Sequence, residues 1–113
     1  MTVSPTKESE VQRLGYESFL CEAVDDGLNV LGRSSRDIIY NLLESDYGIA
    51  KDDIPREFAG FSEVFRKTIG PGAETILDFI VRRFYSKLQV DPPAWKDVDE
   101  AVDVVGKILR RSS

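Results

Sequence analysis

The sequence contains no histidine and a single cysteine among its 113 residues. The absence of histidine removes the side chain most often used as a general base and as an imidazole metal ligand. Because Cys21 is the only cysteine, neither an internal disulfide nor a multi-cysteine metal site can form. The sequence therefore predicts no catalytic residues, no metal ligands and no cofactor.

Long apolar runs are also missing, since no stretch approaches the roughly 20 apolar residues that cross a bilayer. Residues 1–7 are polar and lack the apolar stretch of a secretory signal, so we expect a cytoplasmic protein without a membrane segment. The 20 acidic and 15 basic residues give a net charge of −5, which disfavours nucleic acid as a partner because phosphate backbones are repelled.

An apolar fraction of 42% and a length of 113 residues are typical of one globular domain with one core. We expect a disordered tail over residues 1–7 and a single helical domain over residues 8–113. A helical pattern first appears over residues 8–31, where apolar side chains recur every three or four positions. These are Tyr16, Leu20, Ala23, Val24, Leu28 and Leu31.

Gly27 lies on the same face of this helix and would cost roughly 1 kcal/mol relative to alanine. Close approach of another helix would explain it. Cys21 falls in line with Val24 and Leu28, which favours a thiol at the edge of the core over a reactive one.

The next helix is predicted to begin with Ser34 as its N-cap and to stop at Gly48. Gly48 can adopt the left-handed conformation, and Ile49 can fold back onto Leu43 in a Schellman-like stop. Pro55 is expected in the first turn of a third helix that reaches Ile69, with Gly60 as a point where it divides in two.

The sequence Gly70-Pro71-Gly72 predicts a turn between helices. It lacks the Lys-Ser/Thr pair of a P-loop and the preceding strand of a dinucleotide fold, so a phosphate cradle is disfavoured. Residues 73–88 are apolar on more than one side, which is typical of a central helix.

The final helix is predicted to follow Asp91-Pro92-Pro93 and to run for about 20 residues. Its apolar seam has spacings of three, four, three and four, as in a heptad. The seam comprises Trp95, Val98, Val102, Val105 and Leu109. It can pack on the core of its own domain or pair with a second copy, and one helix can do both. The fold class is therefore all-α, a compact bundle of about five helices with the C-terminal helix at a possible dimer interface.

The acidic pairs Asp25-Asp26 and Asp52-Asp53 are interpreted as surface and capping residues, because adjacent helical side chains point in different directions. Arg82 and Arg83 stand out among the short basic clusters because their helix is otherwise apolar. Each arginine must extend to solvent or pair with an acid.

A set of turn and core positions resembles a known family: residues 31–40, Tyr47-Gly48-Ile49, Asp53-Ile54-Pro55, Phe61 and residues 69–73. These positions resemble the Nitrososphaera output domains, small archaeal domains that occur alone or fused to signalling modules. The resemblance covers residues 19–88. It implies an archaeal source, a compact helical fold and a role in signal output, and it carries over no catalytic or binding residue.

The leading hypothesis is a non-enzymatic helical interaction module that forms a homodimer and has a possible protein partner in signalling. Its predicted interface comprises Trp95, Val98, Val102, Val105, Leu109, Arg82 and Arg83. The alternative is a nucleic-acid-binding regulator in which residues 34–46 and 56–69 form two helices of a DNA-reading module. The acidic balance weakens that alternative.

Overall fold

The computed structural model describes residues 5–111, with side chains from residue 15 to residue 110. Within these residues the chain forms five α-helices and one 3-10 helix and contains no strand, so the all-α prediction is confirmed. The elements are α1 (Pro5–Asn29), α2 (Arg33–Tyr47), η1 (Lys51–Glu57), α3 (Phe58–Ile69), α4 (Ala73–Leu88) and α5 (Val98–Arg111).

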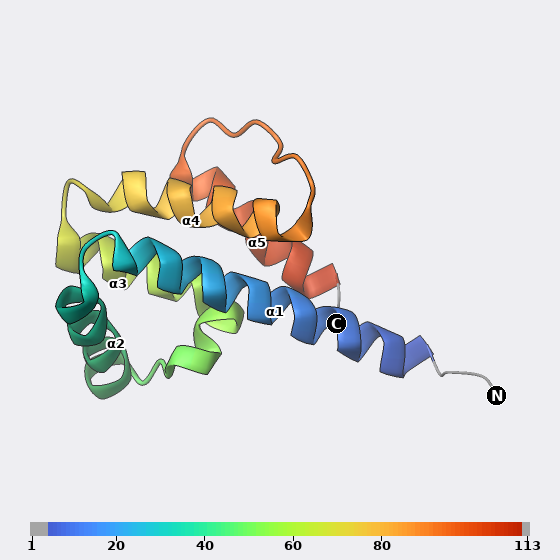
Figure 1. Ribbon diagram of the computed structural model, residues 1–113, viewed down its shortest axis with the longest axis horizontal. Helices are drawn as coiled ribbons and strands as arrows, with labels where there is room; N and C mark the ends of the chain where they lie inside the picture. Colours follow the sequence, from blue (N-terminus) through green and yellow to red (C-terminus); the bar gives the residue numbers. More distant parts are fainter. Residues whose placement is uncertain (1–4, 112–113) are drawn as a thin grey trace.

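Helices α1 and α4 lie antiparallel and side by side through the middle of the molecule (Figure 1). Helix α4 also contacts α3 and α5, which confirms its predicted central position. The first turns of α1 extend past the other helices, and the molecule measures 51 × 32 × 20 Å (Figure 1). Over the described residues, none of the helices combines the length and the apolar character needed to cross a membrane.

Helices α1 and α4 approach each other closely at Gly27. A Cβ atom at this position would overlap Cγ1 of Ile80 and lie 2.9 Å from its Cδ1. Both residues are buried, so the predicted explanation of this glycine is confirmed. Leu20, Val24 and Leu28 fill the core on the same side of α1.

Helix α1 begins at Pro5, three residues before the predicted start. The part of the predicted tail that precedes Pro5 lies outside the described residues. At the other end of α1, the prediction of Ser34 as an N-cap is wrong, because α2 begins at Arg33 and Gly32 precedes it with a φ of 102°. The carbonyl of Gly32 accepts the amide of Arg36, which places Ser34 inside the first turn.

The predicted stop of α2 is confirmed. Gly48 has a φ of 68°, and the amide of Ile49 donates to the carbonyl of Leu43 over 2.9 Å. The chain reverses here and buries Ile49 in the core.

The predicted third helix is two elements, but Gly60 does not divide them. Pro55 lies in η1, and α3 begins only at Phe58. Pro55 has no N–H for an α-helical hydrogen bond, which favours the tighter 3-10 turn before α3. Gly60 is inside α3, where its open side faces only the tip of Ile49.

The predicted start of the last helix at residues 91–93 is wrong. Helix α5 has 14 residues and begins at Val98, and residues 89–97 form an arch over α4 (Figure 1). The side chain of Asp97 accepts the amide of Glu100 over 2.9 Å, and the Glu100 carboxylate accepts the amide of Lys96 over 3.1 Å. These two bonds place the capping residue at Asp97, six residues after Asp91, and the helix begins at Val98.

Candidate functional site

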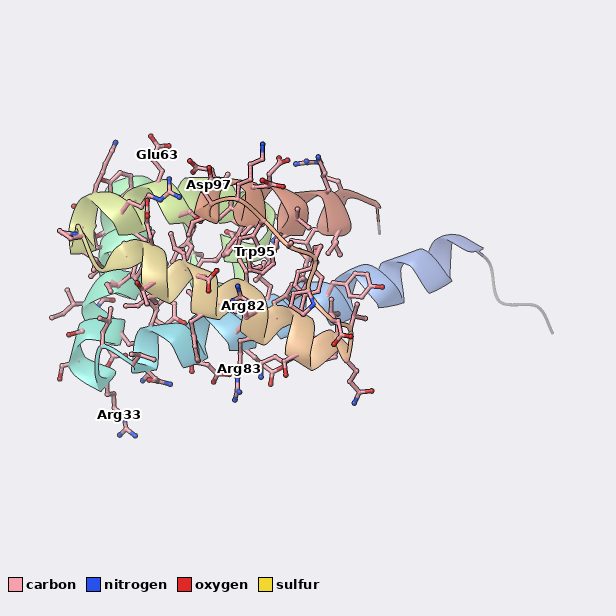
Figure 2. The ribbon with its side chains drawn as sticks, turned by 90° about the horizontal axis from the view of Figure 1, so that it is seen from above. Arg33, Glu63, Arg82, Arg83, Trp95 and Asp97 are labelled. Carbon is pink, nitrogen blue, oxygen red and sulfur yellow. The ribbon has the colours of Figure 1, made fainter. Side chains whose placement is uncertain are left out.

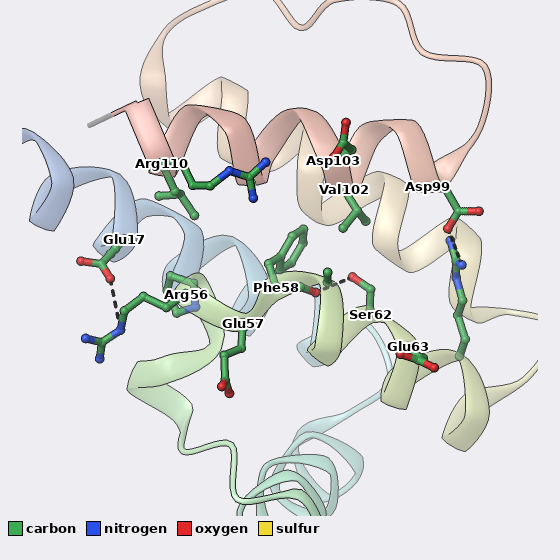
Figure 3. A pocket seen from close by; sticks show the side chains of 15 residues that line it. Glu17, Arg56, Glu57, Phe58, Ser62, Glu63, Asp99, Val102, Asp103 and Arg110 are labelled. Atoms are coloured by element: carbon green, nitrogen blue, oxygen red, sulfur yellow. Dashed lines mark hydrogen bonds and ion pairs between the residues drawn. The ribbon is translucent and has the colours of Figure 1, made fainter. Parts of the chain in front are cut away.

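A groove of about 720 Å³ runs between α3 and α5 and reaches α1 at one end (Figure 3). Residues from η1 and α3 form one side and residues from α5 form the other. Its lining comprises Glu17, residues 55–59, Ser62, Glu63, Arg66, Asp99, Val102, Asp103, Gly106, Leu109 and Arg110.

The floor of the groove is apolar. Phe58 is 3% exposed, while Val102 and Leu109 are each 8% exposed, so these three core side chains reach the floor without leaving the core. Ser62 is the polar residue of the floor, and its hydroxyl donates to the carbonyl of Phe58 over 2.8 Å. The floor therefore suits an apolar contact better than chemistry on a substrate.

One end of the groove presents carboxylates. Nη1 of Arg66 lies 2.6 Å from the Asp99 carboxylate, but the Asp99 side chain is 77% exposed and that of Arg66 only 31%. Nε of Arg66 is buried and has no hydrogen-bond partner within the described part of the chain. Glu63 and Asp103 add two exposed carboxylates at the same end (Figure 3).

The opposite end of the groove presents the guanidinium of Arg56. Nε of Arg56 lies 3.6 Å from the carboxylate of Glu17, and here the arginine is the exposed partner, at 66% against 15%. Arg110 extends from α5 back toward Gly106, whereas Glu57 points away from α5 (Figure 3). The more exposed partner of the ion pair is thus a carboxylate at one end of the groove and a guanidinium at the other.

Gly106 lies on the α5 side near the middle of the groove. A Cβ atom built there would lie 3.4 Å from Nη1 of Arg110, the far end of a flexible side chain, and its three nearest neighbours among the described residues are all atoms of that guanidinium group. Rigid packing inside the subunit therefore does not require glycine at this position, in contrast to Gly27.

The predicted apolar seam is divided by the structure. Val105 is fully buried, and Val102 and Leu109 belong to the same core, so this part of the seam packs within its own subunit. Trp95 and Val98 lie apart from it, at a second depression of about 400 Å³ beside α4.

Trp95 attaches the arch of residues 89–97 to α4. Its Nε1 donates to Asp78 over 2.9 Å, and the Arg82 guanidinium lies over its ring, 4.8 Å from the ring centroid. Arg82 also donates to Asp78 over 2.7 Å. These contacts, together with stacking on Tyr85, give Trp95 a structural role in placing α5.

Arg83 leaves α4 in a different direction from Arg82 (Figure 2) and binds Asp26 of α1 over 3.0 Å. Both arginines therefore pair with an acid. Partial burial opposes ionisation of Asp26, but hydrogen bonds from Arg83 and Lys87 outweigh it and hold the pKa of this carboxyl below its usual value.

The neighbouring Asp25 joins different elements. It accepts the hydroxyl of Tyr40 in α2 over 3.0 Å and lies 3.7 Å from Arg36 and from Lys51. Burial and the negative charge of Asp25 raise the pKa of Tyr40 above its ordinary value. The adjacent acids thus connect α1 to α2 and η1 on one side and to α4 on the other. Within the described residues, no three Cys, Asp or Glu side chains are grouped to hold a metal ion.

Cys21 is half-buried at the edge of the core, as expected. Burial, followed by the negative charges of Asp52 and Glu17, raises the pKa of its thiol. A thiol with a raised pKa carries little thiolate at neutral pH and is a poor nucleophile.

The sequence interpretation missed the groove itself. Asp99, Asp103, Gly106 and Arg110 recur along one face of α5, and this spacing was the available signal.

Comparison of the chain with protein-family models, with curated proteins and with solved structures gave no match. The resemblance to the Nitrososphaera output domains therefore stays an expectation.

Proposed function

We propose that this chain is a non-enzymatic helical interaction module that self-associates through the groove between α3 and α5. The observation that carries the proposal is an apolar groove floor between one end rich in exposed carboxylates and another that presents the guanidinium of Arg56. Apolar contact supplies most of the stabilisation in protein interfaces, while charges at the rim select the partner and its orientation.

A second copy is the occupant that the charge pattern favours. A surface with opposite charges at its two ends is complementary to itself when it is rotated by a twofold axis, because each end then meets its opposite. Val102 and Leu109, two members of the predicted interface, contribute to this surface from its floor. A role in signal output rests on the family resemblance alone.

The alternative of nucleic-acid binding receives little support from the surface. In the predicted second helix of that module, Arg56 pairs with Asp53 and Glu17, Arg66 pairs with Asp99, and Lys67 lies 3.9 Å from Glu63. A phosphate backbone would have to displace these carboxylates.

Sedimentation velocity over about 1–200 μM tests self-association directly. We expect a concentration-dependent shift from the 12.7 kDa monomer toward twice that mass. Ala59→Arg places a long side chain in the groove and should return the protein to the monomer. Thr68→Arg is the matched control, because Thr68 is exposed on the same helix but does not line the groove.

Circular dichroism must show that both variants keep the helical content of the parent chain. A parent protein that stays monomeric at 200 μM contradicts the proposal. A dimer that Ala59→Arg leaves intact contradicts the assignment of the groove.

A further inference from the structure

The groove-facing side of α5 carries a symmetric pattern around one glycine. Asp103 lies three residues before Gly106, and Arg110 lies four residues after it. All three line the groove, and positions three or four apart share a helix face. A twofold axis near residues 106 and 107 would therefore exchange the positions of Asp103 and Arg110.

We infer that two copies of the chain cross at Gly106 with their α5 helices antiparallel, so that Asp103 of each copy pairs with Arg110 of the other. This inference rests on the proposed function and adds the register and direction of the contact. The ridge of one α5 enters the groove beside the other α5, as ridges of side chains do in helix packing.

The direction follows from the charges. An antiparallel crossing places the carboxylate end of each groove against the guanidinium end of the other. A parallel crossing would place Asp99 and Asp103 against the same acids. Asp99 and Arg110 are eleven residues apart, or about 16 Å along a helix, which exceeds the screening length of about 8 Å at physiological salt. The two ends therefore act as separate charges, and only one direction satisfies both.

The pairs that the rim makes inside one subunit can be exchanged at low cost. Asp103 lies 3.2 Å from Lys107, and both side chains are about 60% exposed. Exposed ion pairs of this kind contribute little to stability, so a guanidinium of a second copy can replace the ammonium of Lys107.

Gly106 explains why the crossing falls at this point. A glycine inside a helix is unfavourable unless something requires the open space, and the nearest described atoms to that space inside the subunit belong to the tip of Arg110. When Arg110 reaches toward Asp103 of the second copy, the backbone at Gly106 becomes free for the close approach of another helix. Gly27 has the same role against α4 within the subunit.

Charge reversal tests the pairing. Asp103→Lys alone and Arg110→Glu alone each create two like-charge contacts per dimer, and each should weaken self-association about 100-fold. An equimolar mixture of the two variants should form a heterodimer close to the strength of the parent dimer, because both cross-contacts become opposite in charge again. Arg33→Glu is the matched control, since Arg33 is exposed on α2 and does not line the groove, and it should change the dimer by less than about threefold.

Cross-linking gives a second measurement that does not depend on affinity. In a Cys21→Ser background, an equimolar mixture of Asp103→Cys and Arg110→Cys should form a disulfide between two copies under mild oxidation, because the inferred pairing brings position 103 of one copy to position 110 of the other. Either variant alone should oxidise far more slowly, since its cysteine then meets Arg110 or Asp103 of the second copy.

The outcomes separate the two proposals. A monomeric parent protein overturns both. Suppose that Ala59→Arg disrupts the parent dimer, but each charge reversal leaves it intact or the mixture forms no heterodimer. The assignment of the groove then stands, and the antiparallel register is overturned. Cross-linking of either cysteine variant alone that is as fast as cross-linking of the mixture overturns the pairing of positions 103 and 110.

Discussion

The close approach of α1 and α4 makes Gly27→Ala the most direct test of the core. Alanine is favoured over glycine inside a helix by about 1 kcal/mol, so propensity alone predicts a more stable protein. The new Cβ, however, would overlap Cγ1 of Ile80 and lie 2.9 Å from Cδ1. Ile80 is fully buried and has no free space to rotate into.

Overpacking of this kind costs roughly 2–3 kcal/mol when the neighbours are fixed. After the gain in propensity is subtracted, Gly27→Ala should lower the free energy of unfolding by about 1–2 kcal/mol. The melting temperature of a domain of this size should fall by roughly 4–10 °C. Urea titration followed by circular dichroism measures the change, and an unaltered m-value shows that the unfolded state is unaffected.

Gly15→Ala is the matched control in the same helix. Among the described residues, no atom outside the backbone of α1 lies within 4 Å of the Cβ position at Gly15, so this change should stabilise the protein by about 0.5–1 kcal/mol. In an Ile80→Ala background, which removes both clashing atoms, Gly27→Ala should also become stabilising. The reasoning fails if Gly27→Ala stabilises the parent chain as Gly15→Ala does. It also fails if Gly27→Ala still lowers the free energy of unfolding in the Ile80→Ala background.

Two further predictions concern single side chains. Gln89 ends α4 with a φ of 60°, so Gln89→Gly should raise stability by about 0.5–1 kcal/mol, whereas Gly48→Ala, at a φ of 68°, should lower it by a similar amount. Urea midpoints that shift the same way in both variants would contradict this. Because the pKa of Cys21 is raised, the folded protein at pH 8 should react with a disulfide reagent at least about tenfold more slowly than the urea-unfolded chain. Asp52→Asn should increase the rate at which the Cys21 thiol of the folded protein reacts, and the distant Asp37→Asn should not. Equal reaction rates for the folded and unfolded chains would refute the raised pKa of Cys21.

Much of the fold could be predicted because local signals and tertiary packing agree. The stop at Gly48 and the bounds of α4 follow from turn residues and an apolar pattern that the core then uses. The start of α5 could not be predicted from Asp91-Pro92-Pro93, because two capping signals compete in one short stretch. The cap made by Asp97 on the amide of Glu100, with Glu100 on the amide of Lys96, prevails, and Trp95 ties the preceding residues to Asp78 of α4.

The candidate site was harder to predict because a groove is a property of two helices. The apolar positions of α5 were expected from their spacing, yet spacing cannot say whether Val102 faces its own core or a second copy. The structure shows that it faces the core and reaches the groove floor only at its edge. The charged positions that distinguish the groove come from α1, η1, α3 and α5 together, and no periodicity within one segment contains that information.

The same limit applies to glycine inside helices. Gly15, Gly27 and Gly106 look alike in sequence, and each should weaken its helix by a similar amount. Their surroundings differ: Gly15 faces open space, Gly27 faces a buried isoleucine, and Gly106 faces the guanidinium end of Arg110 near the middle of the groove. Packing within the subunit explains Gly27 and leaves Gly106 without a structural reason. The proposed crossing of two α5 helices gives Gly106 the same physical cause as Gly27, namely the close approach of another helix.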